Sequence, residues 1–165
     1  MKKFICLIVI CLVLSSCSAP PSPLSYQTGI VRATFDVTLG GEDFTLSLDP
    51  SGRTIDVVSP EALGGARLVK GTAKFSLVTD GEETGLPYEL LALSDPLFEM
   101  FSLSETNVEN NNKLGECRIK TGNGEYTVEL SGDGAPERIS FEGARSFAAT
   151  NIRLEYEKIP GQPSD

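Results

Sequence analysis

In VRATFDVTL, residues 31–39, apolar and polar side chains alternate, and this segment is the strongest indication of the fold class. Its apolar positions are Val31, Ala33, Phe35, Val37 and Leu39. A period of two is typical of a β-strand with one face buried and the other in water. We therefore predict a strand here whose apolar face contributes to a hydrophobic core.

The same alternation recurs along the chain. It is found at Phe44, Leu46 and Leu48; Ile55 and Val57; Ala73, Phe75 and Leu77; Cys117 and Ile119; Tyr126, Val128 and Leu130; Ile139 and Phe141; Ile152, Leu154 and Tyr156. Turn signals such as Gly40-Gly41 and Asp80-Gly81 lie between these segments. Strands joined by tight turns pair antiparallel, and the helical crossovers that parallel strands need are missing from the pattern. The predicted fold is mainly β, with one curved antiparallel sheet.

Residues 88–103 are too rich in apolar side chains for alternation. Asp95 and Pro96 resemble a helix start, with a capping acceptor followed by proline at the first helical position. We predict a short central helix over residues 96–102, with another helical turn over 88–93. Its apolar residues fall on nearly every side, so we expect it to lie against the apolar face of the sheet. Residues 105–112 are expected to form a polar loop.

The N-terminus has the parts of a secretory signal peptide. Met1-Lys2-Lys3 is basic, residues 4–14 are apolar, and Ser15-Ser16-Cys17 follows. The apolar run is shorter than the roughly 20 residues that a membrane-spanning helix needs.

Leu14-Ser15-Ser16-Cys17 resembles the lipobox of bacterial lipoproteins. The resemblance implies cleavage before Cys17 and attachment of acyl chains such as palmitate to it. Two or more chains hold a protein stably at a bilayer, so the expected location is the extracytoplasmic face of the cell membrane. The alternative is an ordinary signal peptide that happens to contain a cysteine.

The 165 residues are enough for one domain. We expect a signal peptide at residues 1–16, a lipidated cysteine with a Pro/Ser-rich tether at 17–25, a single β domain at 26–159 and a disordered tail at 160–165. Cys6 and Cys11 lie in the segment to be removed and Cys17 would be acylated, so Cys117 is left as the one free thiol and no disulfide is expected.

Two further segments bear on the fold family: SPEALGG at residues 59–65 and DGAPERI at 133–139. Together with a long antiparallel sheet around a central helical segment, they resemble the LolA-like half-barrel over about residues 28–157. That family includes periplasmic lipoprotein carriers and lipid-anchored proteins of Gram-positive bacteria, among them clostridial germination lipoproteins. The resemblance implies a curved sheet that covers a short helix, and it carries over no functional residue.

Composition excludes one class of partner. The chain has 14 basic and 23 acidic residues and a net charge of −9, whereas nucleic-acid binding needs clustered Lys and Arg. It contains no His, the commonest metal ligand and general base at neutral pH. We expect no nucleic-acid partner, no cofactor and no metal.

The first candidate site is the apolar face between the sheet and the central helix. Its expected lining is Phe35, Val37, Leu46, Phe75, Leu77, Leu91, Phe98, Phe101 and Phe141. If the helix fits loosely, the space is a cleft for an acyl chain or an apolar peptide. If it fits tightly, the same residues simply complete the core. Phe98 and Phe101 stand three residues apart and are predicted to close the face together.

The other candidates have weaker chemical support. Cys117 shares a strand face with Ile119, which predicts a buried, inert thiol, and no His is present to activate it. The acidic pairs Glu42-Asp43, Glu82-Glu83, and Asp133 with Glu137 would suggest a calcium site or a carboxylate pair for glycoside cleavage. They lie at turns, where acidic residues are usually solvated, so no catalytic or metal-binding residue is assigned.

The sequence therefore predicts a non-enzymatic, membrane-anchored lipoprotein that binds a lipid, an acyl chain or an envelope protein. The alternatives are a protein-interaction scaffold or regulator with a filled core and, less favoured, an envelope hydrolase.

Overall fold

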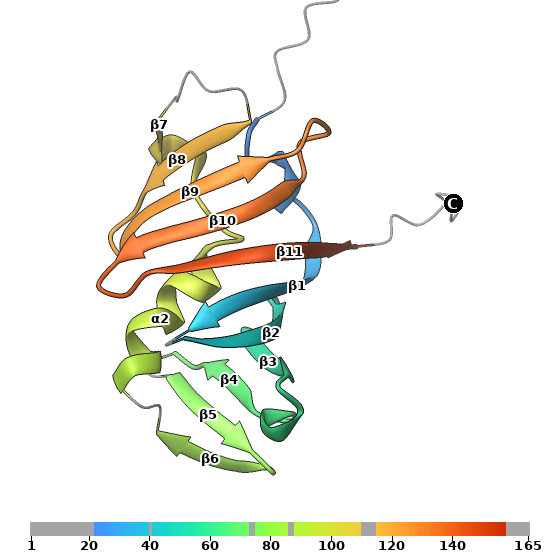
Figure 1. Cartoon of the computed structure of the whole chain (residues 1–165), viewed down its shortest axis with the longest axis vertical. Helices are drawn as coiled ribbons and strands as arrows, with labels where there is room; N and C mark the ends of the chain where they lie inside the picture. Colours follow the sequence, from blue (N-terminus) through green and yellow to red (C-terminus); the bar gives the residue numbers. More distant parts are fainter. Residues whose placement is uncertain (1–21, 40, 73–74, 86–87, 110–114, 158–165) are drawn as a thin grey trace, which may run out of the picture.

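The computed structural model describes residues 22–39, 41–72, 75–85, 88–109 and 115–157, without the side chains of residues 85, 88–92 and 105. Within this part, eleven strands form one curved, open antiparallel sheet, accompanied by one α-helix (Figure 1). The prediction of a mainly-β chain with a curved antiparallel sheet is confirmed.

The sheet consists of two meanders that meet at its centre. The first contains β1 (Ile30–Leu39), β2 (Glu42–Asp49), β3 (Thr54–Ser59), β4 (Arg67–Lys70), β5 (Phe75–Thr79) and β6 (Glu82–Gly85). The second contains β7 (Val108–Glu109), β8 (Glu116–Lys120), β9 (Gly124–Leu130), β10 (Pro136–Gly143) and β11 (Phe147–Tyr156). Their order across the sheet is β6-β5-β4-β3-β2-β1-β11-β10-β9-β8-β7. Pairing of β1 with β11 therefore joins the two ends of the folded chain in the middle of the sheet (Figure 1).

The β1–β11 pair contains two irregularities that change which side chains are buried. Ala33, Phe35 and Val37 are buried, as the alternation predicts, but Val31 is 41% exposed. The pairing register shifts between Ile30 and Arg32, and a bulge inserts an extra residue that the simple period of two does not anticipate. The expectation that Val31 shares the buried face is wrong for this reason.

The helix differs from the prediction in both length and start. It is one continuous element, α2 (Tyr88–Glu99), with Pro96 inside it, instead of a helical turn over residues 88–93 followed by a separate helix over 96–102. Proline lacks the N–H of a helical hydrogen bond, which normally disfavours an interior position. Here Leu93 and Leu97 on either side of it are buried in the core, so tertiary packing overrides the local preference.

Three strands and three 3₁₀ turns were not expected. β4 and β6 are short and lack clear alternation. β7 and the 3₁₀ turn η3 (Glu105–Asn107) lie where a polar loop over residues 105–112 was predicted. Residues 110–112 of that loop fall outside the described part. Such short strands depend on their neighbours for pairing, so sequence periodicity carries little signal for them. At the N-terminal side, η1 (Ser25–Gln27) follows Leu24, which is buried in the core, so packing begins within the segment expected to be tether.

A single hydrophobic core unites both meanders with α2 and the turn after it. Residues 93–103 contribute Leu93, Leu97, Met100, Phe101 and Leu103, each at most 6% exposed. β1, β2 and β3 contribute residues including Phe35, Leu48 and Ile55, and β8–β11 contribute residues including Ile119, Tyr126 and Phe141.

Candidate functional site

The predicted lining residues fall into two groups by exposure. Phe35, Val37, Leu46, Phe101 and Phe141 are buried at 5% exposure or less and belong to the core. Phe75, Leu77 and Phe98 are half-buried at the same side of the sheet. Leu91 lies on α2, but its side chain is outside the described part. The accessible portion of the predicted site is therefore the portion near β4 and β5.

Phe98 and Phe101 do not contact the same part of the sheet. The Phe98 ring stacks on Phe75 of β5, with 5.9 Å between ring centroids and 26° between planes. The Phe101 ring, just beyond the last residue of α2, packs against Phe35 of β1 at 5.8 Å. The two rings therefore contact separate strands of the first meander.

A pocket of about 250 Å³ opens between these rings and two turns of the chain. It is lined by Pro50, Arg53, Lys70, Phe98, Phe101 and Ser102. Two of the predicted lining residues, Phe98 and Phe101, thus meet in this pocket. Two of its lining side chains are aromatic and two are cationic. We refer to it below as the helix pocket.

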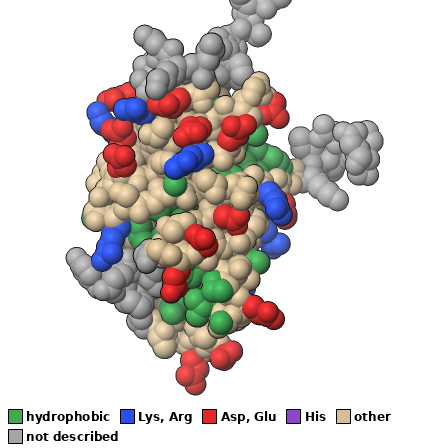
Figure 2. Space-filling view, in the orientation of Figure 1, with side chains coloured by type: hydrophobic (Ala, Val, Ile, Leu, Met, Phe, Trp, Pro, Cys, Tyr) green, Lys and Arg blue, Asp and Glu red, His purple; other side chains and the backbone are tan. Residues whose placement is uncertain are grey.

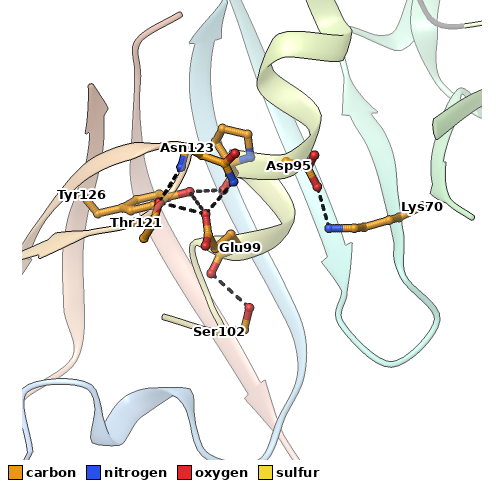
Figure 3. Close-up of polar contacts among 8 residues, drawn as sticks. Lys70, Asp95, Glu99, Ser102, Thr121, Asn123 and Tyr126 are labelled. Atoms are coloured by element: carbon orange, nitrogen blue, oxygen red, sulfur yellow. Dashed lines mark hydrogen bonds and ion pairs between the residues drawn. The ribbon is translucent and has the colours of Figure 1, made fainter. Parts of the chain in front are cut away.

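Lys70 reaches the helix pocket because of its position on β4. It pairs with Phe75 of β5 and follows Leu68 by two residues, so it lies on the same face as these apolar side chains. Its Nζ is 5.4 Å from the Phe75 ring centroid and 5.8 Å from that of Phe98, within the range of cation–π attraction. The same Nζ forms an ion pair of 2.8 Å with Oδ1 of Asp95 on α2 (Figure 3).

Arg53 occupies the tight turn between β2 and β3. Its backbone is left-handed, with φ of 54°, and its carbonyl oxygen accepts a hydrogen bond of 2.9 Å from the Lys70 amide. This bond fixes the turn beside the end of β4. The exposed Arg53 side chain is thereby placed at the helix pocket, which it helps to line.

The other side of the helix is held by the second meander. Glu99 Oε2 accepts hydrogen bonds from Asn123 Nδ2 at 3.0 Å, Tyr126 Oη at 3.2 Å and Thr121 Oγ1 at 3.3 Å (Figure 3). Burial, followed by the nearby Glu99 charge, raises the pKa of Tyr126 far above its usual value, so its hydroxyl stays a donor. Asp95 and Glu99 therefore connect α2 to β4 and β9, in opposite halves of the sheet.

A second, larger pocket of about 480 Å³ was not anticipated from the sequence. Its lining is mostly polar and comes from β1, β2, β3, β10 and β11: Asp36, Val37, Thr38, Asp43, Phe44, Thr45, Ser59, Arg138, Ala148, Thr150 and Asn151. The polar members of β1 and β2 alternate with core residues such as Val37 and Leu46, so this pocket lies on the sheet face away from α2.

The carboxylate of Asp36 accepts two side-chain hydrogen bonds in that second pocket. It accepts hydrogen bonds from Asn151 Nδ2 at 2.8 Å and Thr45 Oγ1 at 2.7 Å, and these lower its pKa. Asn151 has a left-handed φ of 51° at the bulge of β11, which aims its amide at Asp36. A general acid needs a raised pKa, whereas that of Asp36 moves the other way.

The remaining candidates are placed as follows. Cys117 is 4% exposed and burial raises the pKa of its thiol, as expected for an inert group. Cys17 lies outside the described residues. Glu42, Asp43, Glu82, Glu83, Asp133 and Glu137 are all exposed, and acidic side chains are spread over the face seen in Figure 2. Among the described residues, no group of three or more acidic or cysteine side chains is arranged to hold a metal ion.

Sequence analysis missed Lys70 and Arg53 because each is an ordinary charged residue next to a turn. The one available signal was the position of Lys70 two residues after Leu68, in phase with an apolar face. No helix in the described part of the chain is long and apolar enough to cross a membrane. Comparison with protein-family models and with curated proteins finds no match to this chain.

Proposed function

We propose that this protein is a membrane-anchored extracytoplasmic lipoprotein with a LolA-like half-barrel, and that it binds an apolar ligand, a lipid or acyl chain, without catalysing a reaction. The observation that carries the proposal is the helix pocket, which opens onto Phe98 and Phe101 at the edge of the helix–sheet contact. Ligand sites are typically concave and apolar, with a few well-placed polar groups, and the helix pocket has this composition.

The proposed half-barrel is supported by contacts from α2 to both meanders. Asp95 pairs with Lys70 of β4, Phe98 stacks on Phe75 of β5, and the Pro96 carbonyl accepts a hydrogen bond from Tyr126 of β9. A helix that contacts both halves of a curved sheet fits the covered concave face that the LolA-like resemblance implies.

The absence of a catalytic role is proposed on chemical grounds. A hydrolase with two carboxylates needs one that stays protonated near neutral pH. Asp36, which shares the second pocket with Asp43, has a lowered pKa and is held ionised by its two hydrogen-bond donors. Cys117 is buried with a raised pKa, so its thiol is a poor nucleophile.

A second candidate function is a protein-interaction scaffold with a filled core. The observation that favours it is the burial of Phe35, Val37, Leu46 and Phe141 at 4% exposure or less, which leaves these four predicted lining residues inaccessible. On this alternative the helix pocket is a surface irregularity, and binding would use another face of the sheet.

Binding of a fluorescent fatty acid to the full chain separates the two functions. The lipid-binding proposal expects saturable binding that Phe98→Ala weakens. Leu63→Ala is the matched control, because Leu63 is apolar but 45% exposed on η2 (Glu61–Leu63), away from the helix pocket. No saturable binding by the unmodified protein, together with copurification of an envelope protein, would replace the proposal with the scaffold.

The membrane anchor needs a separate test, because it rests on Leu14-Ser15-Ser16-Cys17 alone. The proposal expects the protein from cells to enter the detergent phase, and the Cys17→Ala variant to remain in the aqueous phase. Equal aqueous partitioning of both proteins would contradict lipidation.

A further inference from the structure

We propose that the helix pocket selects amphiphiles with an anionic head group, a carboxylate or a phosphate, which Arg53 and Lys70 bind. This inference rests on the proposed lipid-binding function and adds the chemistry of the ligand. It is argued from the distribution of charge around the pocket.

The helix pocket is lined by two cationic side chains, although the chain as a whole is acidic. The protein has only 14 basic residues against 23 acidic ones, and its net charge is −9. Arg53 and Lys70 nevertheless both line the helix pocket, and its other lining residues, Pro50, Phe98, Phe101 and Ser102, are uncharged. The lining therefore favours anions in a protein that repels them elsewhere.

Lys70 is held in place for an anion at the pocket. Its ammonium group lies over the Phe75 and Phe98 rings and is paired with Asp95, whose side chain is 50% exposed. Asp95 does not line the pocket. An ammonium group has three donors, so Lys70 can keep the Asp95 contact and still donate to a ligand.

Arg53 supplies the second cation. Among the described residues, no ion pair involves Arg53, and its side chain is exposed. A guanidinium group offers several donors in a planar fork that matches carboxylate and phosphate oxygens. Pairing with a ligand head group therefore requires no existing ion pair of the described part to break.

The partial negative charge at the C-terminus of α2 repels an anion in the helix pocket only weakly. Carbonyl groups at a helix C-terminus carry partial negative charge. Here the Glu99 carbonyl oxygen accepts hydrogen bonds from the Ser102 amide at 2.7 Å and the Ser102 hydroxyl at 3.2 Å. These donors offset part of that charge beside the pocket.

The size of the pocket limits what it can hold. At about 30 Å³ for a water-sized group, a pocket of about 250 Å³ accommodates roughly eight such groups. It thus receives the head group and the first carbons of a chain, with the carbons against Phe98 and Phe101 and the head group at the two cationic side chains. Short-chain amphiphiles are suitable probes for this reason.

Isothermal titration calorimetry of the full chain with decanoate, decyl phosphate and decanol tests the inference. We expect at least one of the two anions to bind about tenfold more tightly than decanol, as charge-assisted hydrogen bonds predict. Preference between decanoate and decyl phosphate then distinguishes a fatty-acid carboxylate from a lipid phosphate. Arg53→Gln should bring the favoured anion close to decanol in affinity and leave decanol unchanged. Arg145→Gln is the matched control, since Arg145 is also exposed but lies in the β10–β11 turn.

Asp95→Asn provides a test in the opposite direction. Removing the carboxylate that competes for Lys70 should tighten binding of the anion several-fold and leave decanol binding unchanged. Equal affinity for decanol and both anions would overturn the head-group inference and leave the proposed lipid binding intact. Failure of all three probes to bind, in a protein that also binds no fluorescent fatty acid, would overturn the proposed function itself.

Discussion

The hydroxyl of Tyr126 donates a hydrogen bond of 2.9 Å to the main-chain carbonyl oxygen of Pro96. Tyr126 is fully buried on β9, and Pro96 lies within α2, where its missing N–H removes one helical hydrogen bond. The contact thus joins the sheet to the helix at the proline in the helix interior. The same hydroxyl lies 3.2 Å from the Glu99 carboxylate, so a single side chain of the second meander holds two residues of α2.

Tyr126→Phe should lower the free energy of unfolding by about 1–2 kcal/mol, because it removes the buried donor while keeping the ring. The matched control is Tyr156→Phe, at a residue 47% exposed at the end of β11, which should change stability by less than about 0.5 kcal/mol. Urea denaturation followed by circular dichroism measures both. Equal stability of the two variants would show that the Tyr126 contact contributes nothing.

Phe101→Ala should destabilise the domain more than Phe98→Ala. Phe101 is 5% exposed and packs on Phe35 in the core, so its removal leaves a cavity and costs about 3–5 kcal/mol. Phe98 is half-buried at the helix pocket, where water can enter the space that its ring leaves. Denaturant midpoints of the two variants give the comparison, and a larger loss for Phe98 would contradict this account of the pocket.

Gly143→Ala should destabilise the β9–β10 hairpin by about 1–3 kcal/mol through overpacking. A methyl group at Gly143 would come within 2.5 Å of the Phe141 ring and 2.8 Å of the Asn123 carbonyl oxygen. Gly132 has no heavy atom within 4 Å of the equivalent position, so Gly132→Ala is the control and should be nearly neutral. Thermal unfolding of both variants tests the prediction, and similar melting temperatures would refute it.

Asn151→Gly should make the free energy of unfolding depend less on pH in the acidic range. Hydrogen bonds from Asn151 and Thr45 lower the folded-state pKa of Asp36 below its ordinary value of 3.8. Asp36 therefore contributes stability at pH values above 3.8, and this contribution is lost as the pH falls through the lowered pKa. Glycine accepts the left-handed φ of 51° at this position, so the variant removes the amide without backbone strain.

The measurement for this prediction is the free energy of unfolding from neutral pH down to about pH 2. The Asn151→Gly variant should be less stable than the unmodified protein near neutral pH, and the difference should shrink below pH 3.8. Thr45→Val, which removes the second donor, should act in the same direction. A difference that stays constant with pH would rule out the contribution from Asp36.

The class of the fold can be predicted from the sequence, because strand alternation and turn composition are local properties. The buried faces of Ala33, Phe35 and Val37, and of Cys117 and Ile119, follow from the period of two. The helical character of residues 88–99 is also visible, since their apolar side chains are too dense for a strand.

Tertiary structure alone decided where the helix begins and where the accessible site lies. Pro96 has a strong local preference for a helix start, and only the burial of Leu93 and Leu97 around it shows why the helix continues through it. Val31 is exposed because a bulge in its pairing with β11 shifts the alternation, and pairing partners more than 100 residues apart are not encoded in local periodicity. The helix pocket likewise combines Arg53, Lys70 and Phe98 from a turn, a strand and a helix, which become neighbours only when α2 packs against the sheet. Long-range packing, and not local propensity, sets the position of these three side chains.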